Sequence, residues 1–284
     1  MSGLPTSFID SALASRVEYE ASLKLPDAER GALEARARAK SAAATAKDVV
    51  IVIPTNNPGK ILLFAELNPA LKDKVDFKGP GDFGGFASAE YKKINPQGLY
   101  PACLCSDGLQ LFESTVIVKY LQDKYTAILT EPCEGKTLEA RTISNLIVQL
   151  HDQYISGVNC TQAGFFSNQS ICYKPEMSKT ERAARLADLK KQFGTIEGYL
   201  HASGPWATGD ALTLADISLY PTVAILKALG PRTILGDPIS GCPKLEKWFA
   251  HCDAKPAFHS LSEKMSAFVK PWPMPEAIKA AFSK

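Results

Sequence analysis

The stretch from Ile94 to Ser114, INPQGLYPACLCSDGLQLFES, decides the fold. Its Asn-Pro-x-Gly start predicts the end of a helix. Tyr100-Pro101 follows as a candidate cis peptide just before a strand, because only X-Pro bonds adopt cis at a cost of about 0.5–1 kcal/mol. Residues 102–106 and 109–112 are then predicted to form a hairpin across an Asp-Gly turn.

Glu113 and Ser114 follow this hairpin at the start of the next predicted helix. Helix N-termini carry unpaired N–H groups and partial positive charge, and they therefore bind anions. The segment thus places an extended backbone edge beside an anion site. This combination suits a small peptide with a free carboxylate.

Strands and helices alternate around this segment, which predicts a parallel strand pair. The order is β-α-β-α-β-β-α, typical of a thioredoxin-like domain. The β-branched run VVIVI at 49–53 is typical of a buried strand. The other predicted elements are a helix at 58–67, a strand at 75–77 and helices at 86–94 and 114–125.

Every periodic segment beyond residue 135 is predicted to be helical. We therefore expect an α/β domain at 48–126, a linker at 127–135 and an all-α domain at 136–268. An N-terminal extension at 1–47 and a C-terminal tail at 269–284 complete this division. The predicted helices of the all-α domain span 137–156, 179–201, 213–229, 243–252 and 257–268.

Composition bounds the function classes. The chain has 284 residues, 45% of them hydrophobic, with a net charge of +2, so neither nucleic acid nor a membrane is an expected partner. The odd number of cysteines, seven, favours reduced thiols and a cytoplasmic location. The four histidines lack zinc-ligand spacing, and we predict no metal. Acidic residues scattered through 1–47 favour an arm or packing helix over a transit peptide.

Residues 94–114 resemble the glutathione-binding segment of the glutathione transferase superfamily, and LTLADI at 212–217 resembles the start of its sixth helix. The resemblance covers about residues 48–268. It implies a thioredoxin-like domain joined to a helical domain, with glutathione as co-substrate. It also implies that the Tyr100 backbone before Pro101 pairs with the cysteine of glutathione, and that Glu113 and Ser114 hold its γ-glutamyl end.

The turn PTNNPGK, residues 54–60, lacks the Tyr, Ser or Cys of the commonest classes. It resembles Thr-Pro-Asn-Gly-x-Lys, the corresponding turn of nu-class transferases and of the related fungal nitrogen regulator. This resemblance implies that the Thr55 hydroxyl and the Asn57 amide face the glutathione sulfur as catalytic groups, and that Lys60 assists glutathione binding. Ordinary alternatives remain open: Asn57 as the N-cap before Pro58, Thr55 as a strand-end residue, and Lys60 on a solvated helix face.

Other polar positions carry weaker expectations. Cys103 and Cys105 point to one face of a strand and are expected to behave as small buried hydrophobes rather than redox groups. Thr213 and Asp216 form a capping box, with Asp216 folding back onto the Thr213 N–H. Three residues of the predicted helix 137–156 either line a pocket for the electrophile or belong to core or surface: Arg141, His151 and Tyr154.

Two functions follow as expectations. The first is a glutathione transferase that activates the glutathione thiol for conjugation to a small electrophile or for disulfide reduction. An etherase-type lyase is a variant of this enzyme, because the run from KKINP to ESTVI also resembles bacterial β-etherases. The second is a non-catalytic transferase-like interaction or regulatory module. The resemblance also implies a homodimer that pairs the thioredoxin-like domain of one chain with the helical domain of the other.

Overall fold

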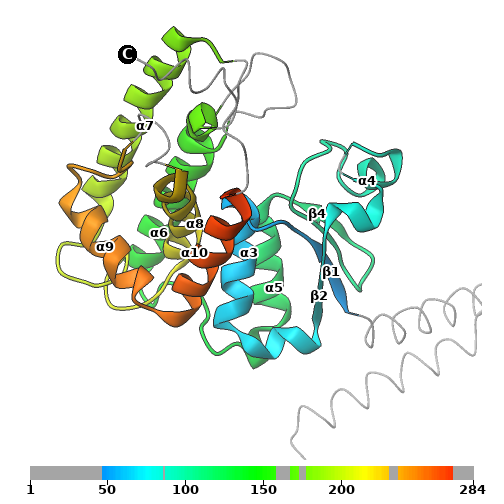
Figure 1. The fold of residues 1–284 in the computed structure, drawn as a ribbon. Helices are drawn as coiled ribbons and strands as arrows, with labels where there is room; N and C mark the ends of the chain where they lie inside the picture. The colour runs from blue at the N-terminus through cyan, green and yellow to red at the C-terminus, as the bar shows by residue number, and fades with distance from the viewer. Residues whose placement is uncertain (1–46, 86, 158–166, 173–176, 230–235, 271–284) are drawn as a thin grey trace, which may run out of the picture.

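The computed structural model describes residues 47–85, 87–157, 167–172, 177–229 and 236–270. A small sheet domain lies beside a larger bundle of helices (Figure 1). The extension and tail predicted at the two termini lie almost wholly outside the described residues. No described helix is both long enough and apolar enough to cross a membrane.

The sheet has four strands in the order β2-β1-β3-β4. As predicted, β1 pairs in parallel with β2, while β3 pairs antiparallel with both β1 and β4. The strands are β1 Asp48–Ile51, β2 Val75–Lys78, β3 Ala102–Leu104 and β4 Gln110–Phe112. The predicted order of strands and helices is therefore confirmed, with each strand differing from its predicted span by one or two residues at an end.

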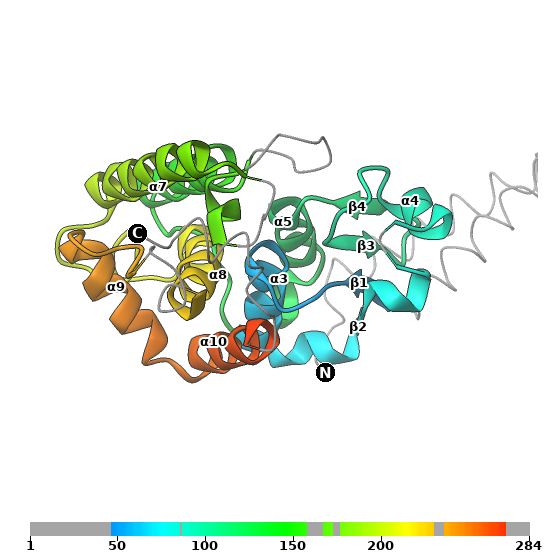
Figure 2. The same ribbon diagram turned by 45° about the horizontal axis from the view of Figure 1, so that its top comes forward.

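Both faces of the sheet are covered by helices. α3 Asn56–Leu67 and α5 Ser114–Lys124 pack on the face that points to the helical bundle, and α4 Ala89–Ile94 packs on the other (Figure 2). Side chains alternate between these faces along a strand. Val50 and Cys103 accordingly belong to the large core shared with α3 and α5, whereas Ile51 and Ala102 pack against α4.

The helical bundle contains five long described helices. α8 lies at its centre and is buried almost all round, as expected for a helix with apolar residues on every face. The helices are α6 Leu138–Leu150, α7 Lys179–Tyr199, α8 Leu214–Leu229, α9 Pro243–Asp253 and α10 Pro256–Val269. The long helix predicted at 137–156 changes character at its end, where His151–Ile155 forms a π-helical turn.

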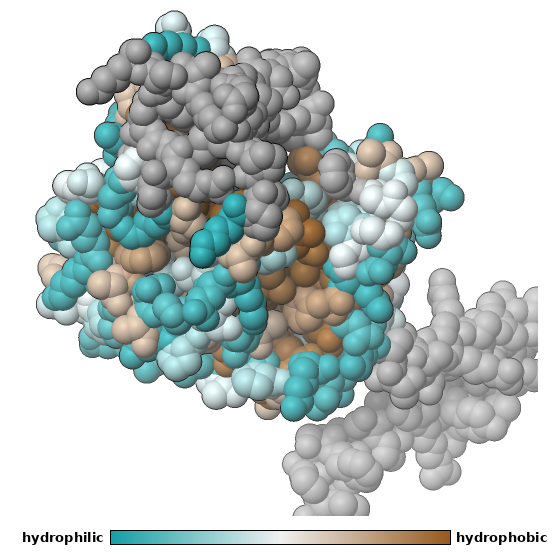
Figure 3. Space-filling view, viewed as in Figure 1, coloured by the Kyte–Doolittle hydropathy of each residue, from teal (hydrophilic) through white to brown (hydrophobic). Residues whose placement is uncertain are grey.

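The two halves meet where α3 lies against α8. A Cβ atom on Gly59 would come within 2.8 Å of the Pro221 side chain, so glycine is the residue that permits this approach. Hydrophobic residues also gather on the surface along this junction in the view of Figure 3. The junction therefore brings the start of α3 close to the helical bundle.

Candidate functional site

The corner before β3 is held by side chains from α4. Tyr100-Pro101 is a cis peptide, as predicted, and α4 ends at the predicted Asn-Pro-x-Gly run. The Tyr91 hydroxyl and the Asn95 amide both donate to the Leu99 carbonyl, each at 2.7 Å. Burial raises the pKa of Tyr91 to about 12, so this hydroxyl stays protonated as a donor. The backbone edge before β3 is thus anchored from α4.

The start of α5 has the features of an anion site. Glu113 is the N-cap and adopts φ 73° and ψ 112°, a conformation that a residue with a side chain rarely takes. Such strain concentrates at ligand sites. The Glu113 side chain makes no capping hydrogen bond, so it does not satisfy the first N–H groups of α5. Ser114, the first residue of the helix, is only 6% exposed.

The start of α3 contains two buried oxygen atoms without hydrogen-bond partners among the described residues, Thr55 Oγ1 and Asn57 Oδ1. Thr55 is the N-cap of α3, and its side chain makes no capping bond. The interpretation of Asn57 as the N-cap is therefore wrong, because the helix begins at Asn56, two residues earlier than Pro58 at N1 would require. Buried polar atoms are nearly always satisfied, so two unpaired oxygens on residues two positions apart make this helix start a candidate ligand site.

Lys60 corrects another expectation. Its side chain is fully buried, so the interpretation as a solvated helix face is wrong. The Nζ atom lies 2.5 Å from Asp152 Oδ1 and 3.2 Å from Thr115 Oγ1. The close packing of α3 on the helical bundle carries this lysine into the junction, where a buried ammonium needs an acidic partner. Lys60 therefore contacts the start of α5 through Thr115, which follows Ser114.

His151 extends this cluster into α8. Its Nδ1 lies 2.7 Å from Asp152 Oδ1, and its Nε2 lies 2.7 Å from Thr222 Oγ1. Burial, reinforced by the charge of Lys60, lowers the pKa of His151, so the ring is neutral at pH 7. Burial favours the neutral form of Asp152, but Lys60 and His151 outweigh it and hold the pKa of this carboxyl below its usual range. His151 thus belongs to the core rather than to an open electrophile pocket.

The structure also places the other polar residues that the sequence analysis singled out. Tyr154 is 52% exposed, and Arg141 donates to the Gly135 carbonyl at 3.1 Å. The capping box is confirmed: Asp216 accepts from the Thr213 N–H at 2.8 Å. Among the described residues, no three His, Cys, Asp or Glu side chains form a cluster suited to a metal ion.

Three residues that contact Lys60 or His151 at the junction were not predicted from the sequence: Thr115, Asp152 and Thr222. Lys60 and Asp152 are 92 positions apart, and nothing in either local sequence pairs them. Thr115 alone carried a signal, because it directly follows Ser114 in the motif. The π-helical turn that contains Asp152 is a feature often found at functional sites, although the sequence pattern there is that of an ordinary helix.

Comparison with known proteins adds the family. Residues 179–251 match the model of the glutathione S-transferase C-terminal domain. Glutathione S-transferase Z1 of Arabidopsis thaliana is 28% identical over 180 residues, covering 62% of this chain and 74% of the relative. These matches support membership of the glutathione transferase superfamily.

Two further comparisons, one with a relative and one with a solved structure, agree with this match. A probable maleylacetoacetate isomerase of Caenorhabditis elegans is 30% identical over 146 residues, covering 48% of this chain and 60% of the relative. A transferase family member from Pseudomonas fluorescens, solved with two glutathione molecules bound, superposes with a TM-score of 0.60 at 19% identity. That superposition covers 76% of this chain and 92% of the other. It shows the shared fold: a thioredoxin-like domain followed by a helical domain.

Proposed function

We propose that this protein is a glutathione transferase that binds glutathione along the Tyr100-Pro101 edge and at the start of α5. The observation that carries the proposal is the pair of unpartnered buried oxygens on Thr55 and Asn57. They lie at the start of α3, where the superfamily resemblance expects the glutathione sulfur. The Thr55 hydroxyl would donate to the thiolate, and Asn57 would contribute a second donor only through its Nδ2 group, since its Oδ1 is an acceptor.

The chemistry required is ionisation of a thiol. A free thiol has a pKa near 8.5, so only a few per cent of it is ionised to thiolate at neutral pH. Hydrogen bonds to the charged sulfur and the partial positive charge of a helix N-terminus both lower this pKa. Thiolate held at the start of α3 would then attack a small electrophile or a disulfide. The hydrophobic surface along the junction in Figure 3 supports an apolar electrophile.

Ser114 provides the test of binding. We expect Ser114→Ala to weaken glutathione binding about tenfold or more, because a hydrogen bond to a charged group contributes about 1.5–3 kcal/mol. Isothermal titration of the full chain with glutathione measures the effect. Ser240→Ala, at an exposed serine of the helical domain, is the matched control and should bind like wild type.

The titration also distinguishes the alternative function. The missing Tyr, Ser or Cys at residues 54–60 favours a non-catalytic interaction or regulatory module. Such a module would show no binding at millimolar glutathione, or binding without any fall in the thiol pKa. Equal affinities for wild type and Ser114→Ala would refute the role proposed for the start of α5.

Thr55→Val separates catalysis from stability. We expect the pKa of bound glutathione to rise by about one to two units, because one hydrogen bond to the thiolate is lost. Turnover with a chloronitrobenzene electrophile at pH 7 should fall about 10- to 100-fold. Ultraviolet absorbance of the bound thiolate across pH provides the direct measurement.

The same substitution should leave the free energy of unfolding unchanged or slightly raised. Thr55 Oγ1 caps nothing and is unpaired in the described structure, so an isosteric methyl group removes a desolvated oxygen at no cost in hydrogen bonds. Thr180→Val, at an exposed position of α7, controls for the chemistry of the replacement. A Thr55→Val protein with wild-type turnover would exclude the hydroxyl as sulfur ligand.

A homodimer and a cytoplasmic location belong to the same proposal. Each half of the molecule offers an exposed large apolar side chain, Val116 on α5 and Leu138 at the start of α6, 47% and 75% exposed. Apolar groups of this size are commonly covered at subunit interfaces. Light scattering of the purified chain measures its mass directly, and a monomer would refute the pairing.

A further inference from the structure

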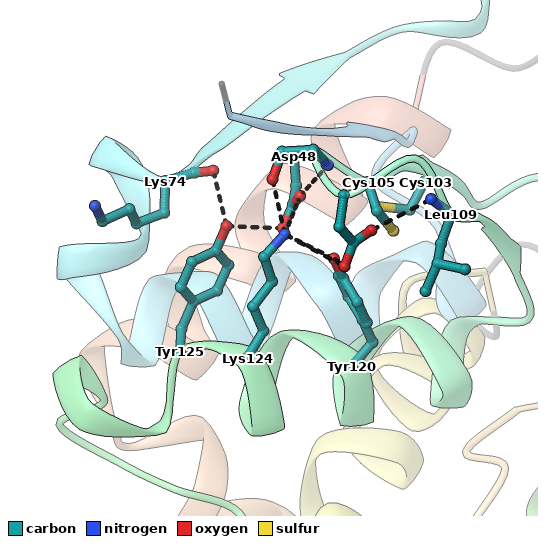
Figure 4. A network of polar contacts seen from close by, with 10 residues as sticks. Asp48, Lys74, Cys103, Cys105, Leu109, Tyr120, Lys124 and Tyr125 are labelled. Atoms are coloured by element: carbon teal, nitrogen blue, oxygen red, sulfur yellow. Dashed lines mark hydrogen bonds and ion pairs between the residues drawn. The ribbon is translucent and has the colours of Figure 1, made fainter. Parts of the chain in front are cut away.

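Two thiols lie in contact at the end of the sheet remote from Pro101. Cys103 belongs to β3, and Cys105 follows that strand directly. Their sulfur atoms are 3.7 Å apart (Figure 4). Cys103 is fully buried, and Cys105 is 7% exposed.

Polar and charged groups lie near both thiols, and Cys105 has Tyr120 and Asp107 among its neighbours. The Tyr120 hydroxyl donates to Asp107 Oδ2 at 2.9 Å and accepts from Lys124 Nζ at 2.7 Å, and its presence beside the Cys105 sulfur lowers the pKa of that thiol. Lys124 Nζ in turn lies 2.8 Å from the buried carboxylate of Asp48. Figure 4 shows Tyr120, Lys124 and Tyr125 rising from α5 toward this end of the sheet. Cys105 therefore lies beside an aromatic hydroxyl, at the edge of a charged network in which Lys124 pairs with the carboxylates of Asp48 and Asp107.

The two thiols differ in acidity. The contacts with Cys103 and Tyr120 lower the pKa of Cys105, although burial and the nearby carboxylates of Asp48 and Asp107 oppose them. The hydrogen bond to Cys105, followed by burial, raises the pKa of Cys103. An acidic, slightly exposed thiol next to a buried, less acidic one is the arrangement of an attacking and a resolving cysteine.

We propose that Cys103 and Cys105 are a redox-active thiol pair, in which Cys105 attacks a small hydroperoxide and Cys103 then closes an intrachain disulfide. This assignment replaces the expectation that both are inert hydrophobes. It concerns a site outside the glutathione site. A small oxidant is required because little of Cys105 is accessible.

The steps balance with the hydroperoxide as the only oxidant. The Cys105 thiolate attacks the terminal peroxide oxygen, the O–O bond breaks, and the alkoxide leaves as an alcohol with the proton that Cys105 has lost. Cys105 is then a sulfenic acid. The Cys103 sulfur attacks the Cys105 sulfur, the S–O bond breaks, and hydroxide leaves as water with the Cys103 proton. Two thiols and one hydroperoxide thus give one disulfide, one alcohol and one water.

The Cα–Cα distance expected for Cys103 and Cys105 lies near the upper limit of the range in which a disulfide can form. Residues two apart on a strand have Cα atoms about 6.7 Å apart, close to the upper limit of about 6.8 Å for a disulfide. Cys105 also begins the hairpin turn, where Gly108 donates to its carbonyl at 2.9 Å. A turn residue shifts more readily than one inside the sheet, so the required movement falls on Cys105.

Mass spectrometry of the full chain tests the proposal. Complete tryptic cleavage gives a peptide of residues 94–119 that contains Cys103 and Cys105 and no other cysteine. After brief treatment with hydrogen peroxide and alkylation in denaturant, we expect this peptide to have lost two hydrogen atoms and to take up no alkyl group. Incubation with glutathione should restore both thiols. If both cysteines are still fully alkylated after the peroxide treatment, the proposal is overturned.

Variants distinguish the two roles. Cys103→Ala should leave Cys105 as a sulfenic acid that dimedone traps, whereas Cys105→Ala should slow peroxide consumption at least tenfold. Tyr120→Phe should slow the reaction about three- to tenfold, because a higher pKa lowers the thiolate fraction while raising nucleophilicity. Cys252→Ala, which removes another buried thiol, is the control and should react like wild type. If Cys105→Ala consumes peroxide as fast as wild type, Cys105 is not the attacking thiol and the assignment is refuted. Poor folding of Cys103→Ala would not change this conclusion.

Discussion

Asp216→Asn should lower the free energy of unfolding by about 3–4 kcal/mol, because it disrupts a buried network of several hydrogen bonds. Asp216 is fully buried at the start of α8. Its Oδ1 accepts from the Ala207 N–H at 2.7 Å and from the Trp248 indole at 2.8 Å. Its Oδ2 accepts from both the N–H and the hydroxyl of Thr213. The carboxylate thus joins a loop, α8 and α9.

An amide cannot replace this carboxylate. It keeps one acceptor oxygen, and its NH2 group would face two donors at the other position. Burial raises the pKa of the Asp216 carboxyl, and the hydrogen bonds from Ala207, Trp248 and Thr213 work in the opposite direction. Urea denaturation followed by circular dichroism measures the loss. A change below 1 kcal/mol would show that the network contributes little.

Asp210→Asn is the matched control. It makes the same chemical change in the neighbouring loop, at an exposed aspartate. Exposed substitutions of this kind usually change stability by less than about 0.5 kcal/mol. A similar loss in both variants would assign the effect to net charge rather than to the buried network.

Lys60→Met should lower the free energy of unfolding by about 2–3 kcal/mol at pH 7. Removing one partner of a buried ion pair costs about 3–5 kcal/mol, and the 30% exposure of Asp152 reduces this value. Methionine keeps most of the side-chain volume, so the loss reports the charge rather than a cavity. Urea denaturation at pH 7 provides the measurement. Lys264→Met controls for it, because Lys264 pairs with Glu66 at the surface.

The cost of Lys60→Met should shrink in acid. The pKa of Asp152 is depressed in the folded protein, so its stabilising contribution is present above the unfolded pKa, about 3.9. The contribution is lost as pH falls through the lower folded pKa. Below about pH 4 wild type therefore loses stability that Lys60→Met no longer has. A difference between the two proteins that stays constant from pH 7 to pH 3 would contradict this assignment.

Local sequence was enough for the parts of the site that are local. The hairpin, the helix start at residue 114 and the corner at Pro101 depend on neighbouring residues, whose turn and capping preferences act over a few positions. The Thr213–Asp216 box was predictable for the same reason. The Asn57 error was a shift of the helix start, because Pro58 is tolerated anywhere in a first turn.

The sequence by itself determined the order of strands and helices, the corner at Pro101 and the helix start at Ser114, because each depends on short-range backbone preferences. Only the tertiary structure decided the environment of Lys60, which pairs with Asp152 across 92 positions. It also decided which cysteine sulfur lies beside Tyr120. Burial and charge pairing arise only when distant segments pack together, and a helix pattern shows which face is apolar but not which charge will be enclosed against it.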